Sequence, residues 1–134
     1  MPGYSGTPLP KKLGLKPGFH VQLTDAPAEV RSELKAELAA CEIVSDGTLL
    51  LDFAMFFTES KAALAKEFKR ISKLLAPAGI FWVSWPKKSS GVATDLNENI
   101  VRDIGLAAGL VDVKVCAVTE VWSGLKFVRR VKDR

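Results

Sequence analysis

Two apolar segments that flank an amphipathic helix constrain the fold of this chain most strongly. Residues 53–57 and 80–85 are almost uniformly apolar, as strands are when both faces of their sheet are covered. Between them, apolar side chains recur at helical spacing, at Leu64, Phe68, Ile71 and Leu75. Two strands connected through a helix normally lie parallel in one sheet. The sequence therefore predicts an α/β protein built on a parallel sheet.

The segment before this unit follows the same alternation of strand and helix. Residues 19–24 alternate apolar and polar side chains, which predicts a strand. Residues 27–40 predict a helix that begins with a proline in its first turn. Its apolar stripe is formed by Val30, Leu34, Leu38 and Cys41. A short strand is predicted at residues 42–44.

The boundaries of the central unit are predicted from its polar residues and its turn formers. The apolar run at residues 48–57 is long for one strand, so we expect Asp52 to divide it. Thr58 is suited to cap the helix that follows. Pro77 and Gly79 are expected to end that helix.

The carboxyl-terminal third predicts a helix followed by a hairpin. Asp95 and Glu98 have the spacing of a capping box, so the helix should begin near Asp95. Its buried face is expected at Leu96, Ile100, Ile104 and Ala107. Alternating valines from Val111 predict a strand, Ser123-Gly124 a two-residue turn, and residues 125–131 the last strand. Such alternation favours an antiparallel edge of the sheet.

Together these elements predict a Rossmann-like architecture, with a mostly parallel sheet, helices on both faces and a C-terminal antiparallel hairpin. Residues 1–18 are rich in proline and glycine, which predicts an irregular leader with at most one helical turn around residues 11–15. Residues 19–134 are predicted to form a single domain. A chain of 134 residues can bury enough surface to fold without disulfides or metals.

Composition constrains the expected location of the protein and the kinds of site that it can contain. There is no apolar run of about 18 residues and no basic start that leads into an apolar stretch, so we expect a cytoplasmic protein without a membrane span. Cys41 and Cys116 are expected to be buried thiols. His20 is the sole histidine and no Cys-x-x-Cys occurs, so no metal site is predicted. No Ser-His-Asp or Cys-His arrangement is recognisable either.

Two segments resemble the catalytic fold of class I methyltransferases. Residues 74–83 resemble its helix-to-strand step, and residues 107–113 resemble its entry into the final strands, where the last strand inserts antiparallel. Such enzymes need a glycine-rich loop after the first strand, because the backbone must approach S-adenosylmethionine closely. The corresponding residues here, 24–27, read Thr-Asp-Ala-Pro, without glycine and with one backbone donor removed by proline. We therefore expect the fold without its cofactor.

Longer strings resemble a narrower family. Residues 3–9, 85–88, 111–118 and 120–126 are similar to a family of small, mostly bacterial proteins that is known only as a domain of unknown function. This resemblance implies a Rossmann-like fold. It assigns no activity, ligand or catalytic residue.

The junction that follows residues 80–85 is the strongest candidate for a binding site. Ligands of α/β proteins usually bind outside the carboxyl ends of sheet strands. Amines and hydroxyls at such a place can bind a phosphate or carboxylate. The candidate ligand-binding residues are Thr24, Asp25, Thr58, Trp85, Lys87, Lys88, Ser89 and Ser90. The alternative, equally open, is a polar turn whose lysines are solvated and whose serines shape the backbone.

The net charge of +4 is mild, and the basic residues gather near residues 11–16, 87–88 and 126–134. Such groups can contact phosphates, but a nucleic-acid surface usually adds exposed aromatic side chains or a recognisable module. We interpret them as solvated loops and termini, so nucleic-acid binding is not expected.

The sequence favours a non-catalytic binding or interaction module on a degenerate methyltransferase-like fold, with a small anionic ligand. The alternative is a small enzyme that acts on an anionic substrate, such as a divergent S-adenosylmethionine-dependent methyltransferase. The missing glycine loop favours the first hypothesis, because fold alone does not establish activity.

Overall fold

A mixed β-sheet organises the part of the chain that the computed structural model describes, residues 7–44 and 50–134. Its strands are β1 (His20–Thr24), β2 (Glu42–Ile43), β3 (Leu51–Phe57), β4 (Leu75–Pro86), β5 (Leu110–Ala117) and β6 (Trp122–Arg129). They lie in the order β2-β1-β3-β4-β6-β5. The first four strands are parallel, and β6 is antiparallel to both of its neighbours. The predicted parallel sheet with an antiparallel C-terminal hairpin is confirmed.

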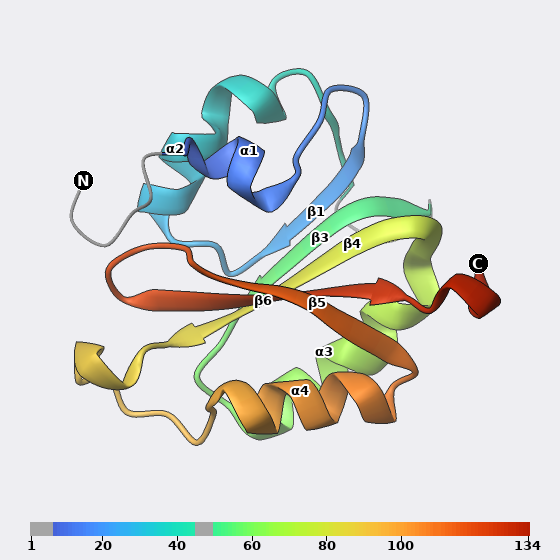
Figure 1. The fold of residues 1–134 in the computed structure, drawn as a ribbon. Helices are drawn as coiled ribbons and strands as arrows, with labels where there is room; N and C mark the ends of the chain where they lie inside the picture. The colour runs from blue at the N-terminus through green and yellow to red at the C-terminus, as the bar shows by residue number, and fades with distance from the viewer. Residues whose placement is uncertain (1–6, 45–49) are drawn as a thin grey trace.

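Helices cover both faces of this sheet (Figure 1). On one face lie α1 (Leu9–Leu13) and α2 (Ala28–Leu38), and on the other lie α3 (Lys61–Leu74) and α4 (Glu98–Ala107). Two short 3₁₀ helices complete the elements, η1 (Lys88–Ser90) and η2 (Val131–Asp133). None of the helices among the described residues has the length and apolar character needed to cross a membrane.

Each face of the sheet carries its own apolar core. Toward α3 and α4, the Phe68 ring packs against Phe81 and Phe127, with ring centroids 4.9 Å apart in both pairs. Toward α1 and α2, the Trp82 side chain is completely buried, and its indole nitrogen donates to the carbonyl oxygen of Leu13 at 2.8 Å. Residues of β3 and β4 belong to both cores, which explains why those two strands read as unbroken apolar runs.

The segment expected to be an irregular leader contributes to the second core. It contains α1 where a single turn was predicted, and Leu9, Leu13 and Leu15 are buried. Gly14 ends this helix in a left-handed conformation, with φ of +81°. The first six residues of the predicted leader lie outside the described residues.

The predicted end of α3 is wrong. The helix stops at Leu74 and β4 begins at once with Leu75, so Pro77 and Gly79 lie inside a strand. The Arg129 guanidinium explains this abrupt change, because it donates to the carbonyl oxygens of Ser72 and Leu75, at 2.6 Å to each. The end of α3 is therefore stabilised by Arg129 of β6, and not by Pro77 and Gly79 as predicted.

Two predicted helix caps are also wrong. The residue that caps α3 is Ser60, whose hydroxyl accepts from the Ala63 amide at 3.1 Å, while Thr58 accepts from the Ser60 amide instead. Helix α4 is capped by Asn97. Asp95 supports the neighbouring helix, since its carboxylate accepts from the amide of Lys61 at 2.7 Å. The predicted cap residues do bond backbone amides, but not those expected from local spacing.

The predicted hairpin turn at Ser123-Gly124 is wrong as well, because both residues lie within β6. The chain reverses before Trp122, and the hydroxyl of Thr119 accepts from the amides of Val121 and Trp122, at 3.0 Å each. Gly124 serves a different purpose. A Cβ there would lie 2.8 Å from a Val118 methyl group, so glycine permits close packing rather than a turn.

The buried stripe of α4 is rotated from the predicted one. Val101 and Gly105 are its buried residues, Ile104 is partly buried, and Ala107 is exposed. Gly105 faces the ring of Phe127, and a Cβ at this position would come within 2.1 Å of that ring. The stripe differs because α4 approaches β6 through a glycine, a contact that a hydrophobic pattern does not reveal.

Candidate functional site

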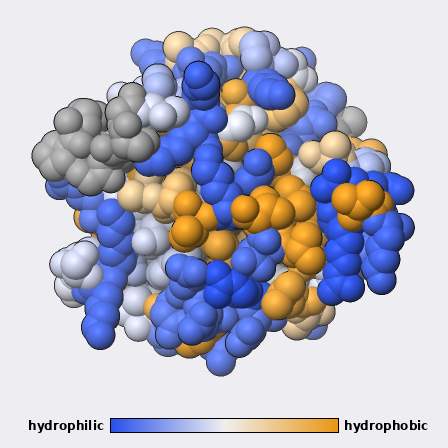
Figure 2. Space-filling model, viewed as in Figure 1, coloured by the Kyte–Doolittle hydropathy of each residue, from blue (hydrophilic) through white to orange (hydrophobic). Residues whose placement is uncertain are grey.

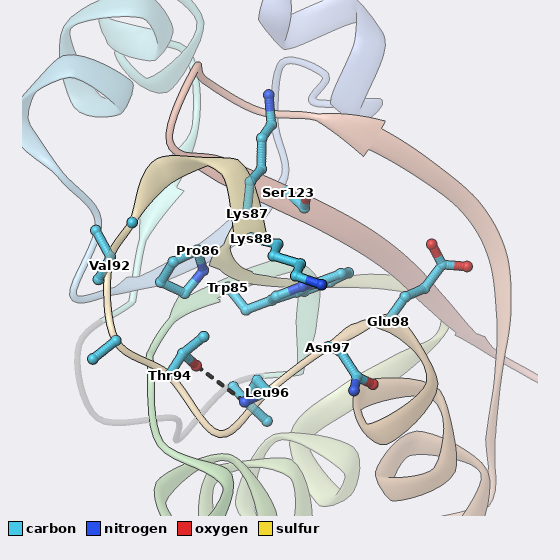
Figure 3. A pocket seen from close by; sticks show the side chains of 12 residues that line it. Trp85, Pro86, Lys87, Lys88, Val92, Thr94, Leu96, Asn97, Glu98 and Ser123 are labelled. Atoms are coloured by element: carbon cyan, nitrogen blue, oxygen red, sulfur yellow. Dashed lines mark hydrogen bonds between the residues drawn. The ribbon is translucent and has the colours of Figure 1, made fainter.

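A pocket of about 670 Å³ opens at the carboxyl end of β4 (Figure 3). One wall comes from β4, η1 and β6, and the other from the segment that leads into α4. The lining residues are Trp85, Pro86, Lys87, Lys88, Gly91, Val92, Ala93, Thr94, Leu96, Asn97, Glu98 and Ser123. Trp85 is only 5% exposed and Lys88 is exposed, so the pocket has an apolar base and a polar rim.

Backbone and hydroxyl contacts fix the loop that follows β4. The amide of Lys87 donates to the carbonyl oxygen of Val121 at 2.7 Å, which ties the loop to the hairpin. The hydroxyl of Ser90 donates to the carbonyl oxygen of Lys87 at 2.6 Å and accepts from the Val92 amide at 3.2 Å. Ser90 therefore shapes the backbone of the turn, which agrees with the alternative hypothesis that this loop is a polar turn. Ser89 is exposed and does not belong to the lining residues.

The opposite wall is held by hydroxyl and amide side chains. The Thr94 hydroxyl donates to the carbonyl oxygen of Glu59 at 2.7 Å and accepts from the amide of Leu96 at 3.1 Å. The Asn97 side chain accepts from the amide of Ile100 at 2.9 Å. These bonds bring the first turn of α4 to the pocket. The backbone N–H groups at the start of a helix favour negative charge nearby.

The two lysines of the loop point in different directions. In Figure 3 the Lys88 side chain extends across the pocket toward the wall from which α4 begins, whereas the Lys87 side chain leads away from the pocket. Within residues 7–44 and 50–134, neither ammonium group forms a hydrogen bond or an ion pair. The sequence could not separate these neighbours: both residues line the pocket, but only the Lys88 side chain extends across it.

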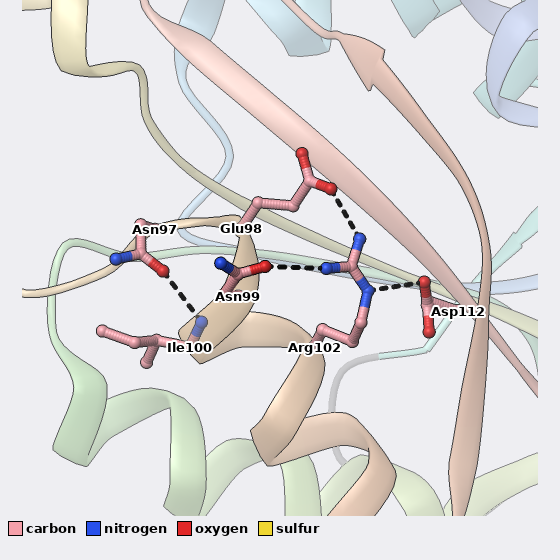
Figure 4. Close-up of polar contacts among 6 residues, drawn as sticks. All are labelled: Asn97, Glu98, Asn99, Ile100, Arg102 and Asp112. Atoms are coloured by element: carbon pink, nitrogen blue, oxygen red, sulfur yellow. Dashed lines mark hydrogen bonds and ion pairs between the residues drawn. The ribbon is translucent and has the colours of Figure 1, made fainter.

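The carboxylate of Glu98, on the rim of the pocket, is paired with the guanidinium of Arg102, which does not line the pocket (Figure 4). The Arg102 guanidinium donates to Asp112 at 2.8 Å, to Asn99 at 3.1 Å and to Glu98 at 2.5 Å. These contacts, to Asp112 first and Glu98 second, raise the pKa of Arg102. Because the Glu98 charge is paired with Arg102, it does not neutralise Lys88, whose ammonium group forms no ion pair among the described residues.

The other candidate residues lie at the carboxyl ends of β1 and β3, where the strand order of the sheet reverses. Asp25 follows β1 with φ of +58°, a left-handed conformation that Asp tolerates. Thr58 follows β3, and it is 7% exposed and bonded to the Ser60 amide. Thr24 ends β1 and is partly buried. None of the three lines the β4 pocket.

Apolar side chains cover this reversal point on the side of α1 and α2. Phe57 and Trp122 meet edge to face, with ring centroids 5.3 Å apart. Leu23 and Ala26 pack against the same core. A strand-order reversal is where Rossmann-like folds usually hold a nucleotide cofactor. Here the residues present do not fit S-adenosylmethionine, because a side chain stands where glycine is needed, Pro27 has no N–H group and aromatic rings lie beside the strand ends.

The sole histidine lies far along the strand from either candidate region. His20 begins β1, at the end opposite Thr24. Its amide donates to the Asp52 carboxylate at 2.8 Å, and its Nδ1 lies 3.3 Å from the same oxygen. Asp52, which was expected to divide the apolar run, lies inside β3. Across the described ranges, no three His, Cys, Asp or Glu side chains gather as a metal site would require.

Several pocket residues were missed by sequence reasoning. Thr94, Asn97 and Glu98 follow the lysine loop closely, and the capping role of Asn97 was the signal that could have placed the start of α4 there. Ser123 reaches the pocket because β6 pairs with β4, where Ser123 lies opposite Trp85. Only the tertiary pairing reveals that contribution.

The comparisons with solved structures identify the architecture. A SAM dependent methyltransferase from Aquifex aeolicus matches with a TM-score of 0.60 and 15% identity, over 87% of this chain and 85% of that chain. Magnesium protoporphyrin IX methyltransferase from Synechocystis PCC 6803, solved with bound SAM, matches with a TM-score of 0.59 and 12% identity, over 91% and 74% of the two chains. The fold is that of methyltransferases.

The same fold relates the chain to Aeropyrum pernix fibrillarin in complex with natively bound S-adenosyl-L-methionine, with a TM-score of 0.55, 12% identity, and coverage of 94% and 70%. No protein-family model matches the sequence, and the search of curated proteins gives no match either. At such low identities the methyltransferase likeness establishes the fold alone. The narrower family resemblance stays a prediction.

Proposed function

We propose that the protein is a binding module whose small anionic ligand occupies the pocket at the carboxyl end of β4. The observation that carries the proposal is the placement of Lys88 across a concave site, with the first turn of α4 on the opposite wall. An ammonium group and a helix N-terminus both favour a phosphate or carboxylate between them.

The size and lining of the pocket support a metabolite-sized ligand. Its volume of about 670 Å³ lies within the range of about 300–1,000 Å³ that is common for small-molecule sites. Trp85, Pro86 and Leu96 supply apolar surface, and Ser123 supplies a hydroxyl group. Apolar walls with a few placed polar groups are typical of such sites.

The hydrogen bonds of the polar side chains around the pocket support a binding role without catalysis. Ser90 and Thr94 are used in loop hydrogen bonds, and the Glu98 carboxylate is held by Arg102. His20 lies at the opposite end of β1. A catalytic pair needs a nucleophile or an acid within hydrogen-bond reach of a base, and the side chains that line this pocket do not form one.

The test follows the indole N–H resonance of Trp85 by NMR while nucleoside monophosphates and sugar phosphates are added. A Trp85→Phe variant assigns the resonance. We expect binding to shift it, and Lys88→Ala to weaken that binding about tenfold, because a hydrogen bond to a charged group is lost. Lys87→Ala is the matched control, since its ammonium leads away from the pocket. Equal weakening in both variants, or no shift with any probe, would refute the proposal.

S-adenosylmethionine is the probe for the enzymatic alternative. The fold likeness to methyltransferases is its only support, and the residues after β1 disfavour the cofactor. We expect no co-purifying adenosyl compound in native mass spectrometry and no adenosylmethionine-dependent thermal shift. A stoichiometric complex that Asp25→Ala abolishes would replace the binding-module proposal with an enzyme.

A further inference from the structure

Lysines from separate parts of the chain converge where α1 meets the β5–β6 hairpin. The lysine cluster consists of Lys12 in α1, Lys16 just after it, Lys87 after β4, Lys114 in β5 and Lys126 in β6. Four of these residues fall in three separate basic groups along the sequence, where they were expected to be solvated. Only the fold brings them together.

Short contacts hold several of these side chains close to one another. The ammonium of Lys12 donates to the carbonyl oxygen of Ala117 at 3.0 Å, and that of Lys114 donates to the carbonyl oxygen of Lys12 at 3.2 Å. The nitrogen of Lys126 lies 3.9 Å from the position that a Cβ on Gly14 would occupy. Backbone carbonyls thus fix ammonium groups on this surface in spite of their mutual repulsion.

The charges that act on the pKa values of Lys126 and Cys116 all belong to lysines. Partial burial lowers the pKa of Lys126, and the nearby charges of Lys114 and Lys16 lower it further. Burial raises the pKa of Cys116, while the nearby charges of Lys12, Lys114 and Lys87 act in the opposite direction. On the margin, Glu37 shares a hollow of about 360 Å³ with Lys11 and Lys16. A multivalent anion would offset the repulsion among lysines crowded in this way.

We propose that the lysine cluster binds a compact ligand with several phosphate groups, at a site separate from the β4 pocket. Figure 2 shows hydrophilic residues where α1 borders the hairpin, with hydrophobic residues over the hairpin beside them. A nucleic-acid strand would also need exposed aromatic faces for its bases. Trp122, the aromatic residue that begins β6, is instead packed edge to face on Phe57. The cluster therefore fits a small polyphosphate better than a strand.

Calorimetric titration with inorganic tripolyphosphate tests this site. We expect Lys114→Ala and Lys126→Met each to weaken binding about tenfold, since each removes a charged hydrogen-bond donor. Affinity should fall as salt is added. The double variant Lys66→Ala/Lys69→Ala, on exposed positions of α3 across the sheet, loses more charge and should bind as the unaltered protein does. Equal weakening in this control would show nonspecific attraction and overturn the proposal.

A second readout separates a binding lysine from a merely structural one. Lys126→Met removes a crowded, partly buried charge, so the thermal midpoint without ligand should rise while tripolyphosphate binding falls. The folded protein releases this proton at a lower pH than the unfolded chain does. Its stability therefore rises with pH from the lowered pKa toward the ordinary value of about 10.4, and the advantage of the variant should shrink over that window. A lowered midpoint without ligand would indicate a structural lysine.

The two neighbouring lysines distinguish this proposal from the proposed function. Lys87→Ala should weaken tripolyphosphate binding while the Trp85 resonance still responds to its ligand, and Lys88→Ala should do the reverse. Failure of one site therefore leaves the other intact. A single-stranded oligonucleotide that binds more tightly than tripolyphosphate would overturn the choice of ligand.

Discussion

At the scale of single residues, Ser84 is unusual because it buries a hydroxyl group in β4 without using it. Its side chain is fully buried, and its Oγ has no hydrogen-bond partner among the described residues. Its carbonyl oxygen, in contrast, accepts from the amide of Thr58 at 3.1 Å. Burial of a polar group without a partner costs free energy.

Replacement of Ser84 by alanine should therefore raise the free energy of unfolding, by about 1 kcal/mol. Urea denaturation with an unchanged m-value measures the gain. The matched change Ser90→Ala should lower stability by about 1 kcal/mol, because the hydroxyl of Ser90 both donates and accepts. A loss of stability in Ser84→Ala would show that its hydroxyl is bonded after all.

At the scale of elements, the contact between α4 and β6 depends on the absence of a side chain. Gly105 lies in the buried stripe of α4, directly against the ring of Phe127. Glycine inside a helix costs up to about 1 kcal/mol relative to alanine. That cost is offset here by a close approach that alanine would prevent.

We expect Gly105→Ala to lower the free energy of unfolding by about 1–3 kcal/mol, against its helix propensity, because the added methyl group overpacks the core. Thermal or urea unfolding measures the change. In the double variant with Phe127→Leu, the combined loss should be smaller than the sum of the single losses. Strict additivity, or a stabilising Gly105→Ala, would contradict the contact.

The same elements show what the sequence can and cannot predict. Periodicity is a local property, so the order of strands and helices was correctly predicted. Element ends depended on distant partners. The guanidinium of Arg129 donates to a carbonyl oxygen in the last turn of α3, and the carboxylate of Asp95 accepts from the first amide of the same helix. Gly124 allows close packing in the core and does not form a turn. The lysine loop was predicted as a candidate site because it follows a strand. The opposite wall of its pocket was not predicted, because it depends on where α4 packs in the folded protein.

At the scale of the whole molecule, α1 joins the rest of the domain through buried side chains, among which Leu13 is completely buried. Leu13 belongs to the core beneath α1 and α2, and its carbonyl oxygen accepts from the Trp82 indole. A cooperative unit should lose stability as a whole when such a residue is truncated.

Leu13→Ala should therefore reduce the global free energy of unfolding by about 2–5 kcal/mol, the usual cost of a cavity left by leucine. Circular dichroism and tryptophan fluorescence should report one coincident transition. The control Leu106→Ala, at a side chain that is 39% exposed, should change stability by less than about 0.5 kcal/mol. Two separate transitions in Leu13→Ala would indicate that α1 unfolds independently.

The placement of β6 between β4 and β5 has a consequence for biosynthesis. As the chain leaves the ribosome, β5 emerges before the strand that will separate it from β4. Until residues 122–129 have emerged, β4 lacks a neighbour on that side and β5 has no place in the sheet. Assembly of this half of the sheet therefore waits until β6 has emerged, and a chain that stops before Trp122 exposes an unpaired edge of β4 and an unpaired β5 to aggregation.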